Sequence, residues 1–287
     1  MRTRPRRRLR SWIRRGLLGL VIGLVALAVI GVIYQAFATE IYRRIYPPPG
    51  ELVDVGGHSL HLNCVGEGSP TVILESGLGA MSVDWANIQP EVADTTRVCA
   101  YDRAGSGWSE PGPGPGDPQQ IAGELHTLLG NAGIDGPYVL VGHSFGGLYV
   151  LMYADQYADQ YPNEVEGMVL VDSSHPEQST RSAQAQAASE ATSAEEFRAT
   201  PETSAQVLPS TQSLGDKPLS VITAGEQEPI WLELQDELAT LSSDSVHRVV
   251  EGATHESLLN DQRDAQVTSM AIIEVVEAVH NGQPLMQ

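Results

Sequence analysis

One serine of the chain stands in a setting that suits nucleophilic chemistry. Ser144 follows an apolar run at 139–141, with Gly142 two residues before it and Gly146 two residues after it. A serine on a sharp strand-to-helix turn needs small residues at these positions, because the strained backbone packs tightly against its neighbours. We therefore expect Ser144 to be a nucleophile; a purely structural glycine-rich turn is the alternative.

A serine hydroxyl is a poor nucleophile until a base takes its proton, so a histidine from elsewhere in the fold must reach it. Among the eight histidines, His255 has the most suitable setting, in a turn between the last predicted strand and the last predicted helix. A carboxylate between serine and histidine in chain order should fix the imidazole tautomer. The sequence offers Asp172 at the end of one predicted strand, and Glu226 and Glu228 after the next.

Attack on a carbonyl group also requires hydrogen-bond donors for the oxyanion that forms. These donors are usually the backbone N–H after the nucleophile and one from the loop after the third strand. Phe145 supplies the first, and we expect the loop at 76–79 to supply the second through Leu78. The alternative for the glycines of this loop is an ordinary tight turn.

The elements that must position these residues alternate between strands and helices, as in an α/β domain with a largely parallel sheet. The predicted strands cover 51–55, 59–65, 71–75, 97–101, 137–142, 166–172, 218–224 and 246–251. The predicted helices cover 84–93, 118–132, 145–160, 230–241 and 263–280. Because only a glycine pair separates the first two strands, they should form an antiparallel hairpin. Residues 176–217 carry few large apolar side chains and are expected to form a loosely held excursion from the domain.

Five motifs follow one another along the chain: SGLG (76–79), YDRAGSGWS (101–109), GHSFGG (142–147), VDSSHP (171–176) and GATH (252–255). In this order they resemble the α/β-hydrolase fold family, and the resemblance covers residues 51–282. It implies an eight-stranded, mostly parallel sheet flanked by helices, with a short cap after the sixth strand, at 176–217. It also implies a Ser-His-acid hydrolase that uses no metal ion and no organic cofactor.

The chain departs from the family pattern in two places. Ser76 stands where many members carry a histidine, which leaves the backbone donors in place and is expected to loosen the support of their loop. The acid usually follows the seventh strand in a Gly-x-x-Asp turn, and this turn reads GEQE at 225–228. Some members take the acid from the end of the sixth strand, where Asp172 is already followed by a turn. We therefore favour Asp172 over Glu228 as the orienting acid.

The N-terminal segment has the properties of a membrane anchor. Residues 16–38 carry no charged side chain, and at about 1.5 Å per residue such a helix crosses a hydrocarbon core of about 30 Å. Eight arginines precede this run and only Arg43 and Arg44 follow it closely, a bias that keeps the N-terminus in the cytoplasm. The predicted organisation is a cytoplasmic basic segment (1–15), a transmembrane helix (16–38), a linker (39–50) and a hydrolase domain on the outer side (51–287).

Two alternatives exist for this segment. The small-x-small run at 36–38 resembles a cleavage site, and Arg14-Arg15 resembles a twin-arginine export signal, so a cleaved signal would give a secreted protein. A buried helix of the globular domain is the other alternative. The apolar run is longer than the core of about 7–15 residues in signal peptides, which favours an uncleaved anchor.

Charge limits the partners of the remaining chain. The sequence holds 17 Lys+Arg and 36 Asp+Glu, and residues 1–46 contain ten of these basic residues but only one acid. The remainder therefore has 7 basic and 35 acidic residues, a formal charge of −28, which repels phosphate backbones and excludes nucleic acid as a partner. The expected partners are a small-molecule ester and, through the N-terminal helix, a membrane. His58 and His61 should face opposite sides of a strand, so no metal site is expected there.

The two cysteines, Cys64 and Cys99, lie in strand-like runs. Two are too few for a disulfide framework or a four-cysteine zinc site. We expect two small buried thiols in the core, with a single bridge between them as the alternative.

These observations favour a membrane-anchored serine hydrolase that cleaves a carboxylic ester. In this hypothesis Ser144 attacks, His255 shuttles the proton and Asp172 orients His255. The same triad would also serve a cofactor-free haloperoxidase or perhydrolase, or a carbon–carbon bond hydrolase, and the scaffold can carry a non-catalytic binding protein. The presence of both Ser144 and His255 argues against the binding protein.

Overall fold

The computed structural model describes residues 6–114, 116–158, 160–178, 181 and 213–285, and the chain divides into two compact units, Met1–Pro49 and Gly50–Gln287. The first unit contains the helix α1 (Arg6–Ile45). Its segment Arg14–Gln35 has a mean hydropathy of 2.8, and among the described residues it is the one helix long and apolar enough to cross a membrane. A membrane anchor and a signal sequence share these properties.

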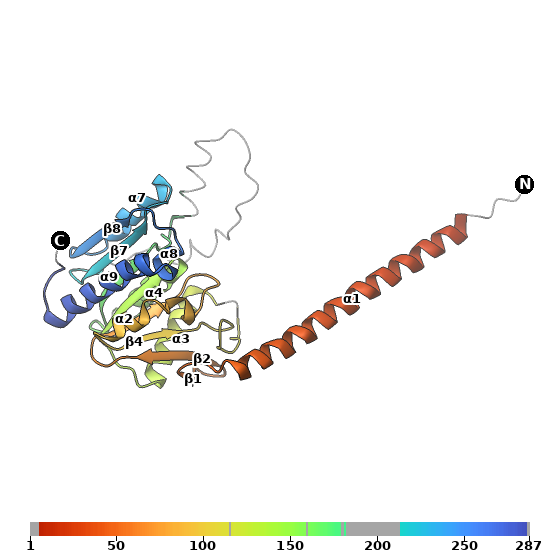
Figure 1. Cartoon of the computed structure of the whole chain (residues 1–287), viewed down its shortest axis with the longest axis horizontal. Helices are drawn as coiled ribbons and strands as arrows, with labels where there is room; N and C mark the ends of the chain where they lie inside the picture. The colour runs from red at the N-terminus through yellow and green to blue at the C-terminus, as the bar shows by residue number, and fades with distance from the viewer. Residues whose placement is uncertain (1–5, 115, 159, 179–180, 182–212, 286–287) are drawn as a thin grey trace, which may run out of the picture. The chain divides into compact units, whose positions relative to one another are not determined.

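The second unit is built on an eight-stranded sheet with the strand order β1-β2-β4-β3-β5-β6-β7-β8. The strands are β1 (Glu51–Asp54), β2 (Ser59–Val65), β3 (Thr71–Glu75), β4 (Val98–Tyr101), β5 (Tyr138–His143), β6 (Val165–Val171), β7 (Leu219–Ala224) and β8 (Ser245–Val250). β1 and β2 form the predicted hairpin, β2 also pairs antiparallel with β4, and the other neighbours are parallel. The predicted α/β fold with an eight-stranded, mostly parallel sheet is confirmed (Figure 1).

Within the described residues, the helices of this unit are η1 (Ser82–Trp85), α2 (Gln89–Ala93), α3 (Pro118–Asn131), α4 (Phe145–Tyr157), α7 (Pro229–Ala239), α8 (Ser257–Asn260) and α9 (Gln262–Asn281). Two of them, α3 and α9, begin after an aspartate whose side chain caps the helix. The side chains of Asp117 and Asp261 accept backbone N–H groups at the starts of α3 and α9, which satisfies donors that the helix itself leaves free. The single helix predicted at 84–93 is divided into η1 and α2, because Pro90 lacks an N–H and fits only the first turn of a new helix.

Helices bury both faces of the sheet. On β5, Leu140 packs in a core cluster with residues of α3 and α4, whereas Val139 and Val141 pack in a second cluster with residues of α2 and α9. Successive side chains of a strand point to opposite faces, so the continuous apolar run of β5 reflects burial on both sides. Because β3 to β8 run parallel to one another, their carboxyl ends lie at the same edge of the sheet. The turns that follow these ends carry the candidate site.

The expectation of two free thiols is wrong, because Cys64 and Cys99 form a disulfide bond. Cys64 on β2 and Cys99 on β4 are directly opposite each other in the antiparallel register of these strands. β2 and β4 are neighbours in space but not in sequence, so the pattern of either strand alone does not reveal this pairing.

Most of the predicted cap at 176–217 lies outside the described residues, which end at 178, apart from 181, and resume at 213.

Candidate functional site

Ser144 occupies the turn between β5 and α4 with a positive φ of 55° and a ψ of −126°. This backbone conformation is costly for a residue with a side chain, and such strain is concentrated at functional sites. A Cβ atom on Gly142 would lie 2.6 Å from Gly147, and one on Gly146 would lie 2.3 Å from the carbonyl oxygen of Glu75. The glycines are therefore required by close backbone approach, as the sequence pattern predicts.

His255 lies between β8 and α8, and its Nδ1 is 2.6 Å from Oδ2 of Asp172. Asp172 directly follows β6, is fully buried, and has a positive φ of 41°. Its carboxylate also accepts hydrogen bonds from the backbone N–H of Ala224, from the indole N–H of Trp231 and from the side-chain amide of Gln227. These donors hold the carboxylate in one orientation, with one oxygen directed at the imidazole.

The turn after β7 therefore contributes to this site in a way that differs from the family pattern. Glu228 is exposed at the start of α7, and Glu226 is exposed as well. The same segment instead supplies Gln227 and Trp231, two neutral donors to Asp172. Sequence reasoning missed both residues; the signal available was the position of Gln227 within the turn that usually carries the acid.

His143, the residue before Ser144, also contacts this group. Its Nε2 donates to the carbonyl oxygen of His255 at 3.1 Å, and the centres of the two imidazole rings are 4.5 Å apart. Burial, together with the nearby His255, lowers the pKa of His143 to about 4. His143 is therefore neutral at ordinary pH and holds the backbone of the His255 turn.

We expect the free energy of unfolding to depend on His143 as pH falls. The pKa of about 4 in the folded state compares with 6.5 for an unperturbed histidine, so the unfolded state takes up the proton first. The contribution of neutral His143 to the free energy of unfolding should be fully present above pH 6.5. It should fall by about 3 kcal/mol as the pH is lowered from 6.5 to 4.

The measurement is urea unfolding of the full chain in detergent at pH 7.5, 5.5 and 4.5, for wild type and His143→Gln. Glutamine keeps an amide donor but does not titrate, so the stability advantage of the wild type should shrink as pH falls. Parallel pH profiles for the two proteins would contradict a buried, neutral His143.

The loop after β3 lies against the nucleophile. A Cβ atom on Gly77 would be 3.0 Å from Cβ of Ser144, so the peptide groups beside Gly77 face the Ser144 turn at close range. Leu78 is largely exposed, and Phe145 begins α4 on the other side of Ser144. Both predicted oxyanion donors are thus on elements adjacent to Ser144.

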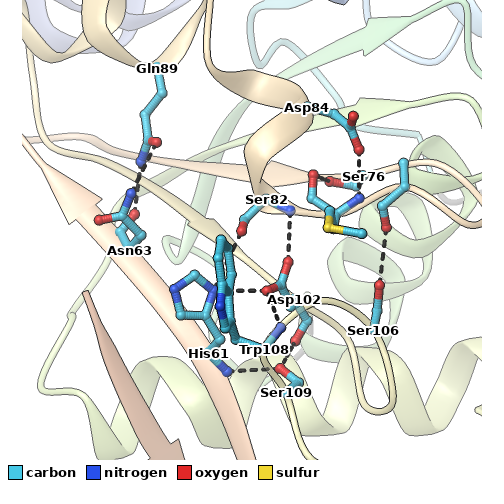
Figure 2. A network of polar contacts seen from close by, with 12 residues as sticks. His61, Asn63, Ser76, Ser82, Asp84, Gln89, Asp102, Ser106, Trp108 and Ser109 are labelled. Atoms are coloured by element: carbon cyan, nitrogen blue, oxygen red, sulfur yellow. Dashed lines mark hydrogen bonds and ion pairs between the residues drawn. The ribbon is translucent and has the colours of Figure 1, made fainter. Parts of the chain in front are cut away.

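A network of hydrogen bonds supports the loop after β3. The Ser76 hydroxyl accepts from the indole N–H of Trp85 at 2.9 Å and donates to the carbonyl oxygen of Met81 at 3.1 Å. Ser76 thus ties the loop at two points, contrary to the expectation that serine at this position loosens it. Figure 2 shows Ser76 close to Asp102, which accepts the backbone N–H of Ser82 at 2.7 Å.

Asp102 is the centre of this network. It forms an ion pair with His61, at 2.9 Å between Nδ1 and Oδ2, and both side chains are fully buried. Burial by itself would raise the pKa of Asp102, but hydrogen bonds from His61 and from the backbone of Ser82 and Trp108 lower it. The YDRAGSGWS motif therefore has a structural role, through Asp102, in joining β2, β4 and the loop after β3. Within the described part of the chain, no group of three or more His, Cys, Asp or Glu side chains could hold a metal ion.

Comparisons with known proteins agree with this architecture. Residues 70–205 match the family model described as alpha/beta hydrolase fold. YqjL, an uncharacterized protein of Bacillus subtilis, is 26% identical over 238 residues, which cover 77% of this chain and 90% of YqjL. Two other curated relatives are matched over only 18% and 29% of their own lengths.

Solved structures give the same result. A thermophilic esterase from Thermogutta terrifontis superimposes with a TM-score of 0.60 and 20% identity, covering 80% of this chain and 98% of the esterase. A bromoperoxidase from Bacillus anthracis superimposes with a TM-score of 0.59 and 16% identity, covering 78% of this chain and 99% of the bromoperoxidase. The chain therefore has the α/β-hydrolase fold.

Proposed function

We propose that this protein is a serine hydrolase that cleaves carboxylic esters through an acyl-enzyme on Ser144. The observation that carries the proposal is the 2.6 Å contact between His255 and the buried carboxylate of Asp172, at the same sheet edge as the strained turn of Ser144. A serine at a sharp turn, a histidine and a buried acid are the groups that acyl transfer needs. The similarity to an esterase supports the choice of substrate class.

In the proposed reaction, His255 accepts the hydroxyl proton while Ser144 Oγ bonds to the ester carbonyl carbon. The carbonyl electrons move to the oxygen, and the backbone N–H groups of Phe145 and Leu78 stabilise the resulting oxyanion. Collapse of this intermediate breaks the bond to the alcohol, which leaves with the proton from His255. Water, deprotonated by His255, then releases the acid and regenerates Ser144, while Asp172 stabilises the imidazolium in both steps.

The test is hydrolysis of p-nitrophenyl esters of increasing chain length by the full chain in detergent. It is combined with labelling by a fluorophosphonate probe and identification of the modified residue by mass spectrometry. Ester turnover together with a probe adduct on Ser144 supports the proposal. A labelled protein that cleaves no ester would contradict it, and perhydrolase and carbon–carbon bond substrates would be tested next, since a bromoperoxidase is among the similar structures.

We also propose that the chain crosses a membrane once, with residues 1–15 in the cytoplasm, 16–38 in the membrane, 39–50 as a linker and 51–287 on the outer side. The apolar length of α1 and the arginine bias around it support this orientation. The Cys64–Cys99 disulfide supports an oxidising compartment for the hydrolase unit. Digestion of this unit by protease added to intact cells is the expected result; a mature N-terminus just after residue 38 would instead establish a cleaved, secreted form.

A further inference from the structure

We propose that Arg103 is the positioning residue of the oxyanion site, because its guanidinium binds the peptide group whose N–H is the Leu78 donor. This role rests on the proposed function, whose mechanism does not include Arg103. It also gives a role to the arginine of the YDRAGSGWS motif, which the Asp102 network leaves unexplained.

The contacts of Arg103 are directed at the backbone of the loop after β3. Nη1 donates to the carbonyl oxygen of Ser76 at 2.5 Å, and Nη2 donates to that of Gly77 at 2.6 Å. The Gly77 oxygen also accepts the backbone N–H of Ala80 at 3.3 Å. Two neighbouring carbonyl groups are thus held by one planar side chain, which is a geometry suited to a guanidinium and not to an ammonium group.

The geometry of a peptide group links these contacts to the oxyanion donor. The carbonyl of Gly77 and the N–H of Leu78 belong to the same planar trans peptide, so they point in opposite directions. When Arg103 binds the carbonyl, the N–H is turned away from the guanidinium. Since Gly77 itself lies against Ser144, the loop is fixed between Arg103 and the nucleophile.

The charge of Arg103 adds to this orientation. A cation at the carbonyl oxygen polarises the peptide and strengthens the N–H as a donor. The guanidinium is itself held in place by an ion pair with the buried Glu75. The carboxylate of Glu75 also accepts a hydrogen bond from the hydroxyl of Tyr101. In addition, Cζ of Arg103 lies 5.1 Å from the ring centre of Tyr149. A donor fixed before the reaction needs no reorganisation when the oxyanion forms.

The rest of the loop is held by other residues, which provides a matched control. The Ser106 hydroxyl donates to the carbonyl oxygen of Ala80 at 3.3 Å, on the same loop but at a different peptide group (Figure 2). Removing this hydroxyl loosens the loop without touching the peptide between Gly77 and Leu78. Ser106→Ala therefore reports the effect of a loop contact alone.

A purely structural ion pair between Arg103 and Glu75 is the competing explanation. Removing Arg103 alone would leave a buried carboxylate uncompensated, which destabilises a fold by itself. The double variant Glu75→Gln/Arg103→Met removes both charges and keeps similar side-chain volumes. Arg103→Lys keeps the charge but cannot bind both carbonyl groups as a fork.

The experiment measures kcat and KM for a p-nitrophenyl ester, the rate of fluorophosphonate labelling of Ser144, and thermal unfolding, all on the full chain in detergent. We expect kcat and the labelling rate of the double variant to fall by about 100-fold, with KM within about threefold and a cooperative unfolding transition retained. Arg103→Lys should lie between the double variant and the wild type, and Ser106→Ala should stay within about twofold of the wild type.

A folded double variant with wild-type kcat and labelling rate would overturn the role of Arg103. If the double variant does not fold, Arg103→Lys decides: unchanged rates in that folded protein overturn the proposal, and a loss confined to kcat and labelling supports it. A wild type that is labelled on Ser144 but cleaves no ester would contradict the ester-hydrolase function alone, since labelling rates still test Arg103. A folded wild type with neither labelling nor turnover would overturn both.

Discussion

Replacing Asp172 by asparagine is expected to lower kcat by about 10⁴-fold, whereas Glu228→Gln should leave kcat within about twofold of the wild type. The carboxylate of Asp172 faces four donors, including His255 Nδ1. An asparagine amide would turn its NH₂ group toward at least one of them. Paired with His255, it would favour the tautomer whose Nε2 carries a proton and cannot accept one from Ser144.

The comparison of these two variants isolates the identity of the acid. Both changes replace a carboxylate by its amide, but Glu228 is exposed and Asp172 is fully buried. Thermal unfolding of each variant separates loss of fold from loss of chemistry. A large drop in kcat for Glu228→Gln with activity retained by Asp172→Asn would reverse the assignment and restore the usual family position of the acid.

Ser144→Ala is expected to reduce kcat by about 10⁶-fold and to abolish the fluorophosphonate adduct. The hydroxyl is the atom that forms the acyl bond in the proposed reaction, so the remaining groups can contribute only binding and oxyanion stabilisation. Ser243→Ala, which removes an exposed hydroxyl bonded to the carbonyl of Gly215, is the matched control and should behave as wild type. Turnover that persists in Ser144→Ala would require a different nucleophile.

A second substitution at Ser144 tests the strain of the turn. Ser144 has a positive φ of 55°, and glycine adopts such a conformation at little cost. Ser144→Gly should therefore be as inactive as Ser144→Ala but more stable than it, by about 1 kcal/mol in the free energy of unfolding. Equal stabilities of the two variants would indicate that the turn stores no strain.

The sequence by itself determined the features whose causes are local. The apolar run of β5, the glycines on either side of Ser144 and the helix that follows define a strand, a turn and a helix. Each depends on residues within a few positions of one another. The same holds for β3, β4, β5 and β7, which read as mostly apolar runs because they are buried on both faces of the sheet.

Only the tertiary structure decided which distant side chains meet. Asp172 and Glu228 both follow parallel strands that end at the same sheet edge, so the sequence favours Asp172 but leaves Glu228 as an alternative. Packing of the β7–α7 turn brings Gln227 and Trp231 to Asp172 and leaves Glu228 exposed.

The disulfide and the contacts of Arg103 likewise join residues that are far apart in the sequence. Cys64 and Cys99 are 35 residues apart, and Arg103 is 26 residues from Gly77. Local sequence encodes backbone preference and the face that a side chain takes, because these depend on near neighbours. Contacts between segments depend on strand order and register, which the packing of the whole sheet fixes.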